Sequence, residues 1–266
     1  MLKVHIAQTT SEKKYNEDTF CYGNNYAMVL DGASGLDQAD RMHTGSDARW
    51  FVVELQKEIQ KHINDDKQLS FIVSDAIQTL IPLYPSVEKS FMPSGCLSLF
   101  RIHDGKAEYI GFGDTVAIIE TKEKTYCLYD HAIERLDHIA IEAMQKSQLP
   151  FAEARESVKD ILIKNRTFRN IPNGYCALDL SMDSFAFCIK KSWNIEDVKS
   201  VALMSDGFYQ LKEFLHQKDD EFLQTLGKQK EKTLPLLYSL QEQDWPCLQL
   251  PRLKKRDDTT ILFFSL

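Results

Sequence analysis

The order of two hydrophobic periodicities along the chain constrains its fold more than any other feature. Alternating apolar residues predict strands at residues 3–7, 19–22 and 26–30 near the N-terminus, and a last strand at residues 259–264. Between these ends, clusters of short strands are interrupted by pairs of helical segments instead of alternating with single helices. This order predicts an α+β layered sandwich and not a series of βαβ units.

The interior of the chain supplies the remaining elements. We expect amphipathic helices with apolar residues spaced over 51–63 and 73–84, with Ser70 capping the second, and two more at 133–144 and, after Pro150, over 151–162. The segments 211–226 and 232–241 are also predicted to be helical. Predicted strands lie at 96–102, 107–112, 116–121, 125–128, 175–180, 184–189 and 201–204. The first four of these strands read as one antiparallel meander, because His103-Asp104-Gly105-Lys106 is a strong hairpin signal.

Composition narrows the class of protein. The 266 residues suffice for one domain, and the 39 acidic against 32 basic residues give a net charge of -7, so no nucleic-acid partner is expected. No stretch approaches the ~20 apolar residues of a membrane span, and the N-terminus lacks a signal peptide, so we expect a cytoplasmic protein with no membrane partner. The six cysteines are dispersed without a C-x-x-C pair, and we expect reduced core thiols.

Four aspartates recur in the same kind of place, at the end of an apolar strand beside a glycine or another acid. They are Asp18, Asp31, Asp206 and Asp257. A single Asp-Gly pair, such as Asp104-Gly105, is usually a turn, but a turn does not explain the set of four. Sites made of carboxylates without histidine or thiol suit hard divalent cations such as Mg²⁺ and Mn²⁺.

Seven short motifs, in order along the chain, carry a resemblance to a known family. They are the segment 13–18, the segment 31–35, Ser94-Gly95-Cys96, Gly113-Asp114-Thr115, Asp130-His131, Ser205-Asp206-Gly207 and Asp257-Asp258. Each motif alone is weak, but seven in the correct order are hard to obtain by chance. The chain resembles the metal-dependent protein phosphatases of type 2C (PPM), in particular bacterial-like single-domain members.

The resemblance implies a fold. It is a four-layer αββα sandwich with two mainly antiparallel sheets flanked by helix pairs. Residues 1–266 would then form one domain, with a flap-like insertion at about 131–175.

The resemblance also implies a site with two Mn²⁺ or Mg²⁺ ions. Asp31 would bridge both ions, Asp206 and Asp257 would complete the first, and Glu17 with the carbonyl of Gly32 would hold the second. In addition, Asp18 would orient metal-bound water and Lys13 would bind the phosphate. A hydroxide bridging the two ions would attack phosphorus in line.

The chain departs from the family pattern at several positions. Lys13 stands where the family has an arginine, and lysine offers a point charge in place of a bidentate fork. Gln210 replaces an aspartate, which puts in doubt a third metal held by Asp114 and Asp206. Ala33 and Ser34 leave no histidine to protonate the leaving group.

Two further questions stay open at the level of the sequence. A metal-bound water or a nearby histidine would have to act as the missing acid. His131 and His43 are the candidate histidines, and for His131 a structural role at a strand-to-flap corner is at least as plausible. Arg166 and Arg169 either meet a phosphorylated substrate or belong to a solvated loop.

Three functions follow from these residues. The leading one is hydrolysis of phosphoserine or phosphothreonine in a phosphorylated protein substrate. The second is a catalytically weak type 2C-like regulatory binding module, and the third is hydrolysis of small phosphate esters. Retention of Glu17, Asp18, Asp31, Asp206 and Asp257 favours an enzyme, because so many clustered carboxylates repel one another without a cation between them.

Overall fold

A computed structural model describes residues 1–266 of the chain. Its strands are β1 (Lys3–Thr10), β2 (Asp18–Tyr22), β3 (Tyr26–Ala33), β4 (Ser94–His103), β5 (Lys106–Phe112), β6 (Val116–Thr121), β7 (Thr125–Leu128), β8 (Leu178–Asp179), β9 (Ile189–Asn194), β10 (Val198–Met204) and β11 (Thr259–Ser265). Its α-helices are α1 (Asp47–His62), α2 (Leu69–Leu80), α3 (His131–Ser147), α4 (Phe151–Ser157), α5 (Lys159–Arg166), α6 (Asp206–Phe214), α7 (Asp219–Gln229) and α8 (Thr233–Gln243).

The strands form two antiparallel sheets. One sheet has the order β1-β11-β10-β6-β7, and the other has the order β2-β3-β4-β5-β9, with β8 paired to β4. The first and last strands of the chain are neighbours, because β1 pairs with β11 from Lys3 opposite Ser265 to Thr10 opposite Thr259. The predicted α+β class is therefore confirmed.

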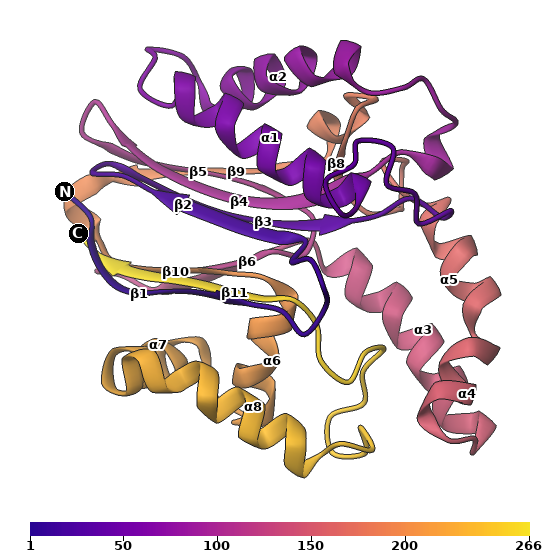
Figure 1. Ribbon diagram of the computed structural model, residues 1–266. Helices are drawn as coiled ribbons and strands as arrows, with labels where there is room; N and C mark the ends of the chain where they lie inside the picture. The colour runs from indigo at the N-terminus through magenta and orange to yellow at the C-terminus, as the bar shows by residue number, and fades with distance from the viewer.

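Helices cover the outer faces of both sheets, as Figure 1 shows: α1 and α2 lie on the β2–β9 sheet, and α6, α7 and α8 lie under the other. Three apolar layers result. One packs α1 and α2 on their sheet through residues such as Phe51 and Leu55, a second fills the space between the sheets, and a third packs α6 to α8 on β10 and β11. This is the predicted four-layer arrangement, except that three helices rather than two cover the sheet that contains β10 and β11.

The helices α3, α4 and α5 lie beside the sandwich, near the ends of its strands (Figure 1). They fall inside the predicted insertion at 131–175 and have a small apolar cluster of their own, which includes Ala140, Met144 and Ala154.

The prediction of a single meander over residues 96–128 is wrong. Strands β4 and β5 pair in one sheet, whereas β6 and β7 pair in the other. The chain crosses between the sheets at Gly113 with φ +78°, where a Cβ atom would lie 2.2 Å from Cys96 Sγ, so only glycine fits. The crossing is fixed by Ser98, whose hydroxyl donates to the Thr115 carbonyl at 3.1 Å. A hydrophobic pattern reports that residues are buried but not against which sheet.

Several predicted elements differ in detail. The helix at 211–226 is broken into α6 and α7, with His216 between them at φ +49°. The helix after Pro150 is broken at Val158. Ser70 does not cap α2, whose N-cap is Gln68.

The region 175–189 contains less strand than predicted. The predicted strand at 175–180 shrinks to the two residues of β8, and a short 3₁₀ helix, Asp183–Ala186, replaces the first half of the strand predicted at 184–189. Apolar residues of both runs pack against the core cluster under α1 and α2, but only the two residues of β8 and Ile189 join a ladder.

Two further findings concern the cysteines and the apolar character of the helices. All six cysteines are free thiols. No helix combines the length and the apolar character that crossing a bilayer demands.

Candidate metal centre

The strand registers bring the predicted acids to one end of the sandwich. On the sheet that contains β2 and β3, Asp18 at the start of β2 is paired directly with Asp31 near the end of β3. Side chains paired in this way share one face of the sheet, with Cβ atoms about 5 Å apart, and like charges placed so are destabilising. The carboxylates of Asp18 and Asp31 therefore repel each other when both are ionised.

The sheet that contains β10 and β11 contributes Asp206 and Asp257. Strand β10 ends at Met204, which pairs with Ile261 near the start of β11, so the residues after β10 and before β11 emerge together. Asp206 opens α6, and Asp257 lies two residues before β11. A Cβ atom on Gly207 would lie 2.1 Å from the carbonyl oxygen of Asp258, so glycine is required for this close approach.

Asp114 joins the same end of the molecule. Val116 at the start of β6 pairs with Met204 at the end of β10, which places the crossing loop beside Asp206. Burial, followed by the charge of Asp206, raises the pKa of Asp114 to about 7. The predicted third-metal residue is thus brought to the cluster.

The electrostatics of the cluster are those of crowded, desolvated acids. Burial raises the pKa of Asp31 well above its usual range, and the charges of Asp18, Asp206, Asp114 and Asp257 raise it further. Burial, together with the charges of Asp258 and Asp206, raises the pKa of Asp18 to about 8. Positive charge placed among these carboxylates would lower their pKa values.

Unpartnered oxygen atoms show that the cluster is suited to a cation. Both carboxylate oxygens of Asp18, whose residue is 5% exposed, and Oδ1 of Asp206 are buried without a hydrogen-bond partner. Buried polar atoms are nearly always paired, so each needs a ligand. Because every donor is a hard oxygen, the residues fit Mg²⁺ or Mn²⁺.

Glu17 and Gly32 lie at the edge of the cluster. The Gly32 amide donates to the Glu17 carbonyl at 3.0 Å, and a Cβ atom on Gly32 would lie 2.8 Å from that same oxygen. The Glu17 carboxylate accepts from the Ser34 hydroxyl at 2.9 Å and from Lys13 Nζ at 3.0 Å. Ser34, which departs from the family pattern, therefore orients a predicted metal ligand.

Two lysines lie among these acids, and only one of them was singled out from the sequence. Lys13 Nζ lies 2.9 Å from Asp258 Oδ2, 3.0 Å from Glu17 Oε2 and 3.6 Å from Asp257 Oδ1. Lys254 Nζ pairs with Asp257 Oδ2. Although burial lowers the pKa of each lysine, the surrounding carboxylates outweigh it and raise both above the ordinary range.

Two further acids of this region were given no role from the sequence, although Asp258 belongs to one of the seven motifs. Asp258 is 3% exposed and accepts hydrogen bonds from Ser11, Lys13 and the Glu17 amide, so it ties the segment 11–17 to β11. Asp137 on α3 has its pKa raised to about 6 by burial and by the charge of Asp206. No local signal marks Asp137, because it belongs to an ordinary amphipathic helix.

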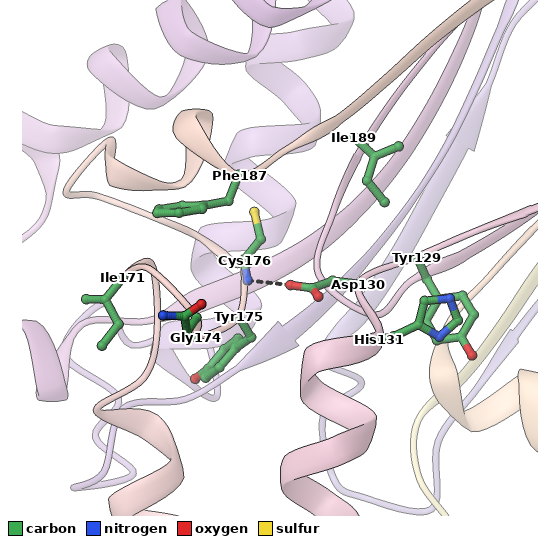
Figure 2. Close-up of a pocket in the computed structure, with 10 residues that line it drawn as sticks. Tyr129, Asp130, His131, Ile171, Gly174, Tyr175, Cys176, Phe187 and Ile189 are labelled. Atoms are coloured by element: carbon green, nitrogen blue, oxygen red, sulfur yellow. Dashed lines mark hydrogen bonds between the residues drawn. The ribbon is translucent and has the colours of Figure 1, made fainter.

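The side chain of neither candidate histidine makes a hydrogen bond or ion pair with an acid of the cluster. Figure 2 shows His131 beside Tyr129, with ring centroids 3.9 Å apart, on the wall of a pocket of about 360 Å³. The His131 side chain is 69% exposed and lies 3.4 Å from Glu134. The neighbouring Asp130 caps α3 and accepts from the Cys176 amide at 2.6 Å, which holds the strand-to-flap corner. His43 is exposed in the loop before α1, at φ +54°.

The two arginines of the predicted flap are anchors within the protein. Arg169 is 5% exposed, with Nε 3.0 Å from the buried Asp179 of β8. Arg166 donates to the Ser34 carbonyl and so ties the end of α5 to the loop after Asp31. Neither arginine lies in a solvated loop.

A separate group of ligand-type residues lies at the other end of β4. Ligand atoms of Asp66, His103 and Asp104 lie within 4.8 Å of one another. His103 follows Cys96, the partner of Asp31, by seven residues of continuous strand, or about 23 Å. This group is therefore distant from the acid cluster.

Solved structures share this architecture. No protein-family model matches the sequence, and no curated protein matches it either. The serine/threonine phosphatase Stp1 from Staphylococcus aureus aligns over 100% of this chain and 95% of its own, with a TM-score of 0.59 and 11% identity. The chain has the fold of the type 2C (PPM) serine/threonine phosphatases.

Two other solved structures share this fold. The catalytic domain of the phosphatase PstP, in complex with two manganese ions, covers 99% of this chain and 97% of its own, with a TM-score of 0.54 and 13% identity. The phosphatase MsPP from Mycobacterium smegmatis covers 100% and 98%, with a TM-score of 0.52 and 13% identity. The resemblance stated from the motifs is confirmed at the level of the fold.

Proposed function

We propose that this protein is a metal-dependent phosphoprotein phosphatase that hydrolyses phosphoserine or phosphothreonine. The observation that carries the proposal is the convergence of Asp18, Asp31, Asp206 and Asp257, which are distant in sequence, with buried oxygens that lack partners. The phosphatase fold and the two manganese ions of PstP support it.

The proposed roles of the residues follow from their places in the cluster. Asp31, Asp206 and Asp257 would hold one divalent cation, and Asp31, Glu17 and the Gly32 carbonyl a second. Bound cations would lower the pKa of water and neutralise charge that develops on the phosphoryl group. Asp18, with both oxygens free of hydrogen-bond partners, is suited to orient the attacking water.

One observation favours the second candidate, a regulatory binding module with weak turnover. Lys13, the residue proposed to bind phosphate, is engaged with the carboxylates of Glu17, Asp257 and Asp258. A lysine held in this way is less available to a substrate than a free one. The two candidates differ in turnover, since both would bind metal.

The test is hydrolysis of p-nitrophenyl phosphate and of a phosphothreonine peptide with added Mn²⁺ or Mg²⁺. We expect turnover of both substrates, lost on chelation and in Asp31→Ala. Asp104→Asn, which alters the distant ligand group, is the control and should retain activity. Metal binding without turnover would favour the module, and full activity after both chelation and Asp31→Ala would refute the metal assignment.

The comparison of the two substrates separates the phosphoprotein phosphatase from the hydrolase of small esters. We expect a higher kcat/KM for the phosphothreonine peptide. A preference for the small ester would favour the third candidate.

A further inference from the structure

A lysine outside every motif considered above lies inside the acid cluster. We propose that Lys254 is a built-in counter-ion of the metal centre, which pairs with Asp257 when no metal is bound and must give way for a divalent cation to bind there. Lys254 thereby determines the affinity of the site for metal. This inference rests on the proposed function, because it assumes that Asp257 is a metal ligand.

The segment that carries Lys254 is held in place by a buried network. Asp244, just after α8, accepts from the backbone amides of Leu248, Gln249 and Leu250 at 2.8 to 3.0 Å. It also pairs with Arg252 at 2.8 Å, and the two side chains are 2% and 5% exposed. The backbone at residue 254 is therefore positioned two residues beyond a fixed point.

The Lys254 side chain reaches inward from that position. Its Nζ pairs with Asp257 Oδ2, and the charges of Asp206 and Asp31 also act on it. The side chain as a whole is 49% exposed, although its charged end is desolvated among the acids. A half-exposed lysine can swing its ammonium out to water when a stronger positive charge arrives.

Both oxygens of Asp257 are engaged by groups that a cation must replace or share. Oδ2 faces Lys254, while Oδ1 accepts from the Asp258 amide at 2.9 Å and lies 3.6 Å from Lys13 Nζ. A divalent cation at Asp257 would therefore meet the Lys254 ammonium at short range, where like charges repel strongly. Removing that ammonium should strengthen metal binding.

The adjacent Lys255 is a matched control. Its Nζ lies 4.5 Å from the ring centroid of Trp245 and 5.5 Å from that of Phe151, and it makes no ion pair with an acid of the cluster. Lys255→Met removes the same charge from the same segment. It leaves the contacts of Asp257 unchanged.

The experiment is calorimetric titration of the chelator-treated, dialysed protein with MnCl₂ at pH 7.5. We expect Lys254→Met to bind its first Mn²⁺ at least tenfold more tightly than wild type, and Lys255→Met to bind it as wild type does. Lys254→Arg restores a cation and should restore the weaker affinity, an effect that a merely structural role would not produce. Thermal unfolding in chelator serves as a second readout: Lys254→Met should unfold at a lower temperature than Lys255→Met, because the acids lose their counter-ion.

The outcomes separate this inference from the proposed function. If wild type and Lys254→Met bind Mn²⁺ equally, the inference is wrong and the metal site stands. If neither binds Mn²⁺, both are wrong. Binding by Lys254→Met alone would support the effect of Lys254 on metal affinity and would refute the proposed metal-dependent activity of the natural protein.

Discussion

At the scale of single residues, the site depends on positions where one atom more would break it. Gly207 follows Asp206 and lies against the segment that leads into β11. A Cβ atom at this position would lie only 2.1 Å from the Asp258 carbonyl oxygen. The sequence predicted this glycine only as part of a Ser-Asp-Gly motif. The reason for the glycine is a contact between segments fifty residues apart, which no local pattern shows.

Replacing this glycine tests that contact. We expect Gly207→Ala to destabilise the protein by roughly 2 kcal/mol, because backbone rather than a flexible side chain must move. Urea unfolding measures the change. Gly227→Ala, inside helix α7, is the matched control. Its Cβ atom would meet only Phe263, at 4.0 Å, and alanine favours helix over glycine, so stability should be unchanged or slightly higher. Equal effects of the two substitutions would contradict the close packing at Asp258.

Asp18 offers a second test at this scale, because it combines a proposed role in catalysis with an energetic cost. We expect Asp18→Asn to raise the stability of the chelated protein at pH 9 by about 1 kcal/mol, since a buried charge facing Asp31 is removed. Phosphatase turnover should fall by about a hundredfold. Urea unfolding in chelator and a peptide assay with Mn²⁺ check the two effects. A loss of stability in Asp18→Asn at pH 9 would show that the Asp18 charge does not destabilise the folded protein.

At the scale of elements, most helices and strands could be predicted because each has one face in a core layer. The predictions were wrong at residues 184–189, where only Ser184 is buried and a 3₁₀ helix forms, and at the break between α6 and α7, where apolar residues on both sides pack in the same core layer. The convergence of Asp31 with Asp206 was inferred only through a family resemblance. Strand register, which places these residues together, depends on pairing partners that are distant in the sequence.

The segment between α8 and β11 provides a test at the scale of elements. Asp244 accepts three backbone amides and an arginine while almost fully buried, so Asp244→Ala should cost about 3 kcal/mol of stability. The exposed Glu142, whose ion pair with Lys146 lies in water, gives the control Glu142→Ala with a change below about 0.5 kcal/mol. Thermal unfolding distinguishes them. A small effect at Asp244 would mean that this segment is not fixed by the network.

At the scale of the whole molecule, the acid cluster should make the metal-free protein unusually sensitive to alkali. The pKa values of Asp18, Asp31 and Asp114 are raised in the folded state, so above pH 4 the folded protein binds more protons than the unfolded chain. The stability that these groups contribute is complete below their unfolded pKa values and is lost as pH rises through about 7 for Asp114 and about 8 for Asp18.

We therefore expect the free energy of unfolding in chelator to fall between pH 5 and pH 9, by about 1.4 kcal/mol per pH unit for each acid that is protonated in the folded state and ionised in the unfolded chain. Added Mn²⁺ should remove most of this fall, because the cation favours the ionised acids. Urea unfolding at several pH values, with and without Mn²⁺, measures both effects. Stability that rises with pH in chelator would contradict the crowding of acids described here.

The most direct test of the central claim, that these distant acids converge to hold divalent cations, is anomalous diffraction from crystals soaked in MnCl₂. We expect two peaks, bounded by Glu17, Asp31, Asp206 and Asp257. Peaks confined to Asp66, His103 and Asp104, or no peak among the converging acids at millimolar Mn²⁺, would contradict the account.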